Sequence, residues 1–295
     1  MREFDRRALL RYSGMAAASL MLRGEGFALG QDARVTATTN AGRVSGRMEN
    51  GMYVFRGIPY GEDTQKTRFK APLPVAVWSG VKECVEWSTR APQMVGERMG
   101  RDAAAAGEPV RTGFHLPPDK GTQSEDCLHV NVWTPGLRDG KKRPVLFYIH
   151  GGAYNNGTVN CDLYDGNRLC HRGDVVVVTV NHRLNAFGYL YLGDLGGKEY
   201  ADSGNAGMLD IILALEWVQQ NIAEFGGDAS RVLIFGQSGG GAKCATLMAM
   251  PAAKGLFHRV LTMSGQQVTA KPTVIATEVT KDVLDRLGVK YDRLD

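Results

Sequence analysis

The sequence predicts an α/β fold with a mostly parallel, doubly wound sheet, preceded by an antiparallel hairpin region. Near-continuous apolar runs over residues 145–149, 175–180, 232–235 and 260–263 are typical of strands buried on both faces of such a sheet. Between the second and third runs, apolar residues recur at helical spacing over residues 208–225. Strands that alternate with helices indicate right-handed crossovers and an open sheet, here in one domain over residues 31–295.

The elements before this region follow a different pattern. Apolar and polar residues alternate over residues 35–38, 44–48 and 52–58, and Asn and Gly residues separate these segments. The alternation predicts hairpin strands at an edge of the sheet. Residues 60–118 are rich in Gly, Pro and charge, so we expect a long surface loop region there.

Residues 1–30 have the composition of a cleavable export signal. The pair Arg6-Arg7 precedes an apolar run over residues 12–22, and Ala28 and Gly30 are small residues at the expected cleavage site. The paired arginines resemble a twin-arginine signal, which predicts a periplasmic or secreted protein. The alternative is a membrane anchor, but a spanning helix needs about 20 apolar residues, so we expect no stable membrane insertion.

The charge and the cysteines exclude several classes of function. The formal net charge is +4, and half of it lies in the signal, so a basic surface for nucleic acid is not expected. Five cysteines are too few for a disulfide scaffold and cannot all pair. The sequence has no closely spaced metal-ligand motif, so we expect neither a metal site nor a cofactor.

The candidate nucleophile is Ser238, within Gly236-Gln237-Ser238-Gly239-Gly240. This motif follows a predicted buried strand and precedes a helical stretch, which is the context of a nucleophile elbow. Glycines two residues on either side allow close backbone approach, and the start of the helix favours negative charge at an attacked carbonyl. The pattern therefore predicts a serine nucleophile that attacks an ester, a small-molecule substrate.

Such an attack produces an oxyanion, which needs backbone amide donors placed in advance. The segment His150-Gly151-Gly152-Ala153-Tyr154 follows the predicted strand over 145–149 and resembles the glycine-rich loop that supplies these donors in esterases. We expect the donors to be the amides of Gly152, Ala153 and Gly239. The first residue, His150, is expected to brace the loop.

Two longer stretches identify a family resemblance. The segment Ser124-Glu125-Asp126-Cys127-Leu128 continuing to Pro135, together with the Ser238 motif, resembles the two signature stretches of the type B carboxylesterases. That family includes cholinesterases and bacterial para-nitrobenzyl esterases, and the likeness extends over about residues 35–268. It implies the α/β-hydrolase fold and a serine carboxylic-ester hydrolase that acts through an acyl-enzyme.

The resemblance also implies roles for residues outside the elbow. Arg68 and Glu125 correspond to a buried ion pair that ties the loop region to the sheet; a solvated pair is the alternative. Cys127 matches a cysteine that commonly forms a disulfide with an upstream partner, for which Cys84 is the candidate. Gln237 replaces the glutamate of many members, and the loss of that negative charge favours neutral esters over cationic ones.

The acid and the histidine of a catalytic triad are not found in the sequence. In this fold the triad follows the order Ser, Asp or Glu, His. After Ser238 there is one histidine, His258, directly before the strand over 260–263, and we expect it to be structural. Three acidic residues lie on an apparent amphipathic helix too early to be the triad acid: Glu278, Asp282 and Asp285.

We therefore expect the C-terminal part of the fold to be absent from this sequence. Either this is the N-terminal part of a longer esterase, or it is a natural truncation that is nearly inactive. A third reading is a noncatalytic binding or adhesion module with the cholinesterase-like fold. The oligomeric state is open.

Overall fold

One mixed sheet organises the part of the chain that the computed structural model describes, residues 34–94, 117–267 and 269–291. Its order is β1-β2-β3-β5-β7-β6-β8-β9, and β4 pairs with β2 beside this path. The strands are β1 (Arg34–Thr38), β2 (Arg43–Glu49), β3 (Met52–Pro59), β4 (Val81–Glu83), β5 (His129–Thr134), β6 (Arg143–Ile149), β7 (Val176–Val180), β8 (Gly227–Gln237) and β9 (Arg259–Met263).

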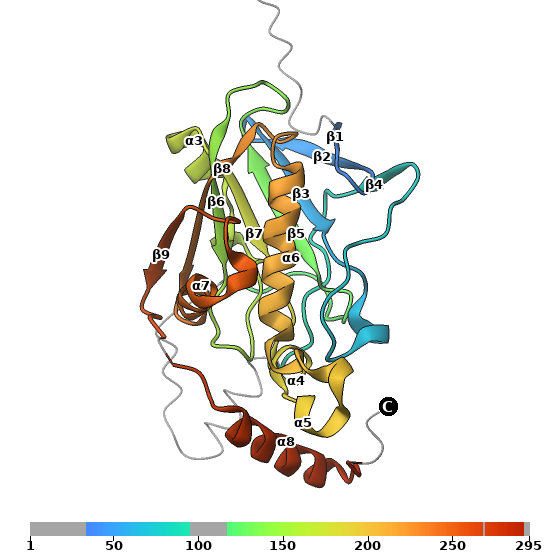
Figure 1. Ribbon diagram of the computed structural model, residues 1–295. Coiled ribbons are helices and arrows are strands. Elements are labelled where there is room, and N and C mark those ends of the chain that lie inside the picture. The colour runs from blue at the N-terminus through green and yellow to red at the C-terminus, as the bar shows by residue number, and fades with distance from the viewer. Residues whose placement is uncertain (1–33, 95–116, 268, 292–295) are drawn as a thin grey trace, which may run out of the picture.

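The sheet has an antiparallel part and a parallel part. The pairs from β1 to β7 are antiparallel, through β2, β3 and β5. The pairs β7–β6, β6–β8 and β8–β9 are parallel. In Figure 1 the blue N-terminal strands and the red strand β9 accordingly lie at opposite edges of the sheet. The predicted parallel sheet with an antiparallel N-terminal region is therefore present.

Helices cover both faces of the sheet. They are α3 (Asn167–Gly173), α4 (Asn185–Tyr189), α5 (Gly193–Gly196), α6 (Ala206–Asn221), α7 (Gly239–Ala249) and α8 (Thr273–Leu287). On β6, Val145, Phe147 and Ile149 belong to the main core with α6 and α7, whereas Leu146 packs on a smaller cluster that includes Cys170 of α3. Because successive strand residues point to opposite faces, α3 lies across the sheet from α6.

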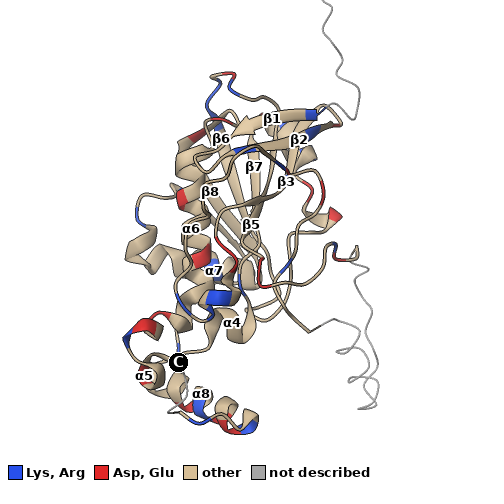
Figure 2. Ribbon diagram, turned by 90° about the vertical axis from the view of Figure 1, so that its right-hand side faces the viewer, with Lys and Arg blue, Asp and Glu red and all other residues tan. Residues whose placement is uncertain are grey.

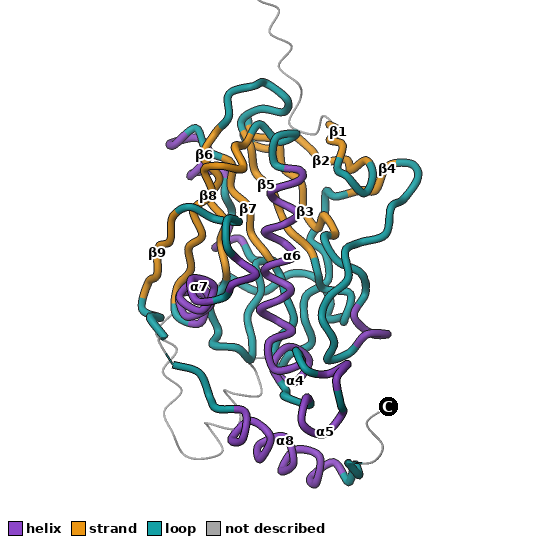
Figure 3. Tube along the Cα trace, in the orientation of Figure 1, coloured by secondary structure: helices purple, strands orange, loops and turns teal. Residues whose placement is uncertain are grey.

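The loops and charges are distributed around this core. Figure 3 shows residues 60–94 as mostly loop beside β3, interrupted by the turn η1 (Thr64–Thr67) and by β4. Charged residues gather in loops and on α5 and α8, whereas the central strands carry few of them (Figure 2). In the described ranges, no helix is both long and apolar enough to cross a membrane. The predicted export signal lies outside the described residues.

Two element boundaries and one strand differ from the sequence expectation. The helix expected over 208–225 is α6, which ends at Asn221, and β8 begins at Gly227, before its apolar run. No strand was predicted over β5, which contains the polar residue Asn131. Asn131 is nevertheless buried: its Oδ1 accepts from the Gly57 amide at 2.9 Å, and its Nδ2 donates to the Thr179 hydroxyl at 3.1 Å. A buried amide with both ends bonded costs little in a strand.

The expected ion pair between Arg68 and Glu125 forms, but it is not buried. Arg68 Nε donates to the two carboxylate oxygens of Glu125 at 2.9 and 2.7 Å. The Glu125 side chain is 12% exposed and the Arg68 side chain is 48% exposed. The guanidinium lies at the outer rim of the loop region, so water screens the pair and limits its stabilising effect to about 1 kcal/mol or less.

The buried ion pair of this region is instead Arg183–Asp210, which the sequence analysis did not pair. Arg183 follows β7, Asp210 lies in the second turn of α6, and their side chains are 1% and 0% exposed. The guanidinium donates to both carboxylate oxygens, at 2.6 to 3.1 Å. It also donates to the carbonyl of Lys70 at 2.9 Å. This pair therefore ties the loop region to the sheet, the task expected of Arg68 and Glu125.

The expected disulfide between Cys84 and Cys127 is not present: all five cysteines are free and buried. The Cys84 thiol lies 3.8 Å from the Gly57 carbonyl oxygen. Burial raises the pKa of Cys84 to about 12 and raises that of Cys127 well above its usual range. Both side chains are part of the main apolar core. They act there as small hydrophobic residues with inert thiols.

Candidate active site

Ser238 stands at the sharp turn between β8 and α7. It has φ +55° and ψ −123°, a conformation that is strained for a residue with a Cβ. Its amide donates to the Met263 carbonyl at 2.8 Å, which ties the turn to the end of β9. The strand, turn and helix expected around the candidate nucleophile are thus present, and the side chain is half-buried.

The glycines of the elbow, residues 236–240, are required by close backbone contacts. A Cβ on Gly240 would lie 2.0 Å from the Ile149 carbonyl oxygen, and one on Gly236 would lie 2.5 Å from the Gly240 carbonyl carbon. A Cβ on Gly239 would lie 2.2 Å from the Ala153 carbonyl oxygen. The end of β6 and the segment after it therefore press directly against the elbow.

That segment, residues 150–154, is called here the glycine loop. Gly152 and Ala153 both have left-handed backbone, with φ +89° and +52°. The Gly152 carbonyl accepts from the amides of Asn155 and Asn156, both at 3.2 Å, which closes the turn. In a left-handed conformation at two successive positions, the chain doubles back toward Gly239.

The three predicted oxyanion donors lie around the elbow. In the described part of the chain, the amides of Gly152, Ala153 and Gly239 donate no hydrogen bond to another protein group. An ideal Cβ on Gly239 would be 2.6 Å from the Ala153 nitrogen, so those two residues are in contact beside Ser238. Such amides, at a strained turn and at a helix start, can donate hydrogen bonds to a negatively charged oxygen of a ligand.

His150 braces the glycine loop, as expected. Its Nδ1 donates to the Gly151 carbonyl at 2.8 Å, because a carbonyl can only accept. Its ring stacks on His182 with centroids 4.8 Å apart. Burial, followed by the charge of Lys243, lowers the pKa of His150 to about 3. The ring is therefore neutral near pH 7, and its buried Nε2 has no hydrogen-bond partner within residues 34–94, 117–267 and 269–291.

His258 is remote from the candidate nucleophile. Its Nδ1 accepts from the amide of Val232 at 3.3 Å, and its own amide donates to the Val232 carbonyl at 2.8 Å. Val232 precedes Ser238 by six residues on β8, and at 3.3 Å per residue this separates them by about 20 Å. Within the described residues, the Ser238 hydroxyl forms no hydrogen bond with a histidine.

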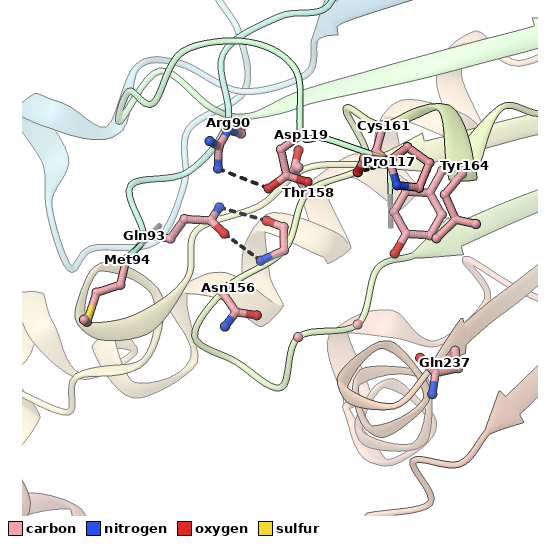
Figure 4. A pocket seen from close by; sticks show the side chains of 14 residues that line it. Arg90, Gln93, Met94, Pro117, Asp119, Asn156, Thr158, Cys161, Tyr164 and Gln237 are labelled. Atoms are coloured by element: carbon pink, nitrogen blue, oxygen red, sulfur yellow. Dashed lines mark hydrogen bonds and ion pairs between the residues drawn. The ribbon is translucent and has the colours of Figure 1, made fainter. Parts of the chain in front are cut away.

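A pocket of about 380 Å³ lies beside the glycine loop. Figure 4 shows Gln237 on one side of it and Arg90, Gln93 and Asp119 on the other. Arg90 and Asp119 are the charged residues among the described part of the lining, and they pair with each other at 3.4 Å. The lining is otherwise neutral and comprises Gln93, Met94, Pro117, Gly151, Gly152, Asn156, Gly157, Thr158, Cys161, Leu163, Tyr164 and Gln237.

Comparisons with known proteins show which family this chain resembles. The model of the carboxylesterase family matches residues 32–292. The para-nitrobenzyl esterase of Bacillus subtilis is 39% identical over 259 residues, which are 88% of this chain and 49% of the relative. The phenmedipham hydrolase of Pseudarthrobacter oxydans is 36% identical over 264 residues, covering 86% of this chain and 49% of the relative.

Solved structures show the same likeness. A carboxylesterase of Geobacillus stearothermophilus superposes with a TM-score of 0.76 at 39% identity, covering 87% of this chain and 49% of that one. An esterase of Clostridium hathewayi superposes with a TM-score of 0.74, also at 39% identity and with the same coverage. The chain thus spans about half the length of the relatives it matches. With its mixed sheet and its matched residues, the chain belongs to the carboxylesterase family and has the α/β-hydrolase fold.

Proposed function

We propose that this chain supplies the nucleophile and the oxyanion hole of a serine carboxylesterase. The observation that carries the proposal is the convergence at the elbow: Ser238 is held at φ +55°, and the amides of Gly152, Ala153 and Gly239 lie around it without a partner among the described residues. A strained turn of this kind costs about 1 to 3 kcal/mol, so it needs a compensating reason to persist. Presentation of a hydroxyl to an ester is such a reason.

In the proposed reaction, Ser238 Oγ attacks the carbonyl carbon of the ester and loses its proton to a base. The oxyanion that forms receives hydrogen bonds from the three amides, and collapse expels the alcohol, which takes up the proton. Water then attacks the acyl-enzyme in the same way and releases the carboxylic acid. In terms of protein groups, the described residues supply the first nucleophile and the oxyanion donors.

The base of this reaction is proposed to come from residues that the sequence does not contain. Among the described residues, His150 and His182 are buried with their Nδ1 atoms committed to carbonyls, and His258 bonds to Val232 in the middle of β8. A serine with an oxyanion hole but no base retains a rate about 10³ to 10⁴ above that in water. We therefore expect the chain by itself to be nearly inactive.

Neutral esters are the proposed substrates. Gln237, next to the nucleophile, is exposed and uncharged, and Arg90 and Asp119, the two charges in the described lining of the adjacent pocket, pair with each other. Among these described lining residues, a cationic ester would find no unpaired carboxylate and an anionic ester no unpaired cation. The para-nitrobenzyl esterase among the relatives is named for an ester of this neutral kind.

A noncatalytic binding module is the second candidate, and it is favoured because none of the described residues is a base hydrogen-bonded to Ser238. The two candidates differ in whether the hydroxyl reacts. The test is phosphonylation of the chain by a fluorophosphonate probe, which loses fluoride, followed by intact mass and peptide mapping, with free imidazole added as a substitute base. We expect one modification, at Ser238, which imidazole accelerates. The Ser238→Ala variant should take up none.

The outcomes separate the candidates. If the folded chain remains unmodified with imidazole present, the esterase proposal is refuted and the binding module stands. If the Ser238→Ala variant is modified as fast as the parent, the reagent reacts elsewhere and Ser238 is not the nucleophile.

Export through a twin-arginine signal is a further part of the proposal. It rests on Arg6-Arg7, the apolar run over 12–22 and the small residues before Gln31. We expect the mature protein in a bacterial host to begin at Gln31 and to appear outside the cytoplasm. Replacement of both arginines by lysine should leave the precursor uncleaved inside the cell, and normal cleavage of that variant would contradict the route.

A further inference from the structure

Lys243 is a buried cation on α7, the helix that follows the candidate nucleophile. It lies on α7, five residues after Ser238, and its side chain has no exposed surface. In the described part of the chain, no carboxylate pairs with it. A buried ammonium without an anionic partner is unfavourable in a core, so its persistence calls for a specific contact that uses it.

Its contacts are with the glycine loop. Lys243 Nζ donates to the Ala153 carbonyl at 2.5 Å and lies 3.5 Å from the Gly239 carbonyl oxygen, one helical turn away. The same ammonium lies 4.6 Å from the centroid of the Tyr154 ring. That ring packs edge-on against Tyr189 at 4.9 Å. A desolvated cation gains from both contacts, because a charge-assisted hydrogen bond and a cation–π contact are strongest away from water.

These contacts fall at the point where the loop needs support. Ala153 is a non-glycine residue at φ +52°, and it is exposed to solvent on its other side. Its carbonyl is anchored by Lys243 on α7, while its amide is the candidate oxyanion donor. With the carbonyl fixed in a left-handed residue, the direction of the preceding amide is restricted as well.

We propose that Lys243 is a positioning residue of the oxyanion hole, whose ammonium holds the Ala153 carbonyl so that the Ala153 amide faces Ser238. The inference rests on the proposed esterase function. In this proposal, α7 has a second role besides following the nucleophile. Its Lys243 holds the glycine loop, whose amides stabilise the oxyanion that forms when Ser238 attacks the ester. Lys243 itself touches neither substrate nor the reacting atoms.

The other groups that face Lys243 are uncharged near pH 7. His150 and His182, from the ends of β6 and β7, have pKa values lowered first by burial. Tyr154, from the loop, and Cys244, on the same helix, have pKa values raised by burial. Burial also lowers the pKa of Lys243 to about 7. The positive charge of Lys243, which holds the Ala153 carbonyl, is therefore present below about pH 7 and is lost as the pH rises above 7.

The test compares the parent with Lys243→Met and with Leu247→Ala, a buried position on α7 that destabilises the same helix without touching the loop. Two rates are measured from pH 6 to pH 9: phosphonylation of Ser238 by the fluorophosphonate probe with imidazole present, and deuterium exchange of residues 150–157. We expect Lys243→Met to slow phosphonylation about 10²-fold at pH 6, the cost of a misplaced catalytic group. The difference should shrink toward pH 9, and exchange of the loop should be faster in the variant.

Leu247→Ala should lower the midpoint of thermal unfolding and change neither rate by more than a few-fold. Lys243→Met at the parental phosphonylation rate, or a loss of rate matched by Leu247→Ala, overturns the inference. If Ser238 of the parent is not phosphonylated, the proposed function fails, and the positioning role of Lys243 is then judged from deuterium exchange of residues 150–157 alone. Faster exchange in Lys243→Met than in Leu247→Ala then supports the positioning role, and equal exchange overturns it.

Discussion

Removal of the Arg183 guanidinium is the perturbation whose effect on stability follows most directly from the structure. In an Arg183→Met variant, the Asp210 carboxylate keeps its fully buried position and loses its counter-charge and the three guanidinium contacts. The loss of one partner of a buried ion pair costs about 3 to 5 kcal/mol, because the remaining charge is uncompensated. The Lys70 carbonyl would also lose its donor.

The matched control is Arg68→Met, which removes the same group from a pair whose arginine is 48% exposed. Water already screens that pair, so the expected loss is under about 1 kcal/mol. The double variant Arg183→Met/Asp210→Leu removes both buried charges and should be more stable than Arg183→Met alone, since no isolated carboxylate remains.

The assay is urea unfolding of each variant, with the free energy of unfolding extrapolated to water. A typical domain has about 5 to 15 kcal/mol of stability, so an Arg183→Met variant should remain measurable. Equal losses for Arg183→Met and Arg68→Met would refute the assignment of the buried pair. A double variant less stable than Arg183→Met would show that the hydrogen bond which the Arg183 amide still donates to Asp210 Oδ2, at 2.9 Å, outweighs the cost of the isolated charge.

Three further predictions follow from contacts and pKa shifts. Gly239→Ala places a Cβ 2.2 Å from the Ala153 carbonyl oxygen and should abolish phosphonylation of Ser238. The control Gly255→Ala, at a position with open space and φ +84°, should lose only about 1 kcal/mol of stability and keep the parental phosphonylation rate. Equal phosphonylation rates for the two variants would contradict this expectation. The thiols of Cys84 and Cys127 should resist a thiol reagent at pH 8 until the chain is unfolded, and rapid reaction of the native chain would disprove their burial. Because the pKa of His150 is lowered to about 3 in the folded chain, the free energy of unfolding should be highest above the unfolded pKa of about 6.5 and should decrease as the pH falls toward 3. A His150 proton resonance that titrates near pH 6.5 in the folded chain would refute this lowered pKa.

Residues with a local conformational signature were predictable from the sequence. The apolar runs of β6, β7 and β9 gave their positions within one or two residues, and the strand, Ser238 and helix succession was recognised from its glycines. These features depend on periodicity and on backbone requirements of neighbouring residues. The same signals failed at β5, where Asn131 is polar because its partners lie on other strands.

The ion pairs show where local signals end. The sequence contains both Arg68–Glu125 and Arg183–Asp210, and nothing in the spacing of either pair tells how deep it lies. Depth depends on which elements cover the two side chains. Arg68 lies on an outer loop, whereas Asp210 faces inward from α6 onto the end of β7. Burial, and with it the size of the electrostatic stabilisation, is a property of the assembled layers.

The sequence by itself determined the family, the positions of β6, β7 and β9, and the candidate nucleophile, because each is encoded in short stretches whose residues need one particular backbone. The tertiary structure decided which charges are buried, that Cys84 and Cys127 stay unpaired, and that Lys243 reaches from α7 to the glycine loop. Those outcomes join residues 27 to 90 positions apart, and only the packing of the sheet and its helices brings them together.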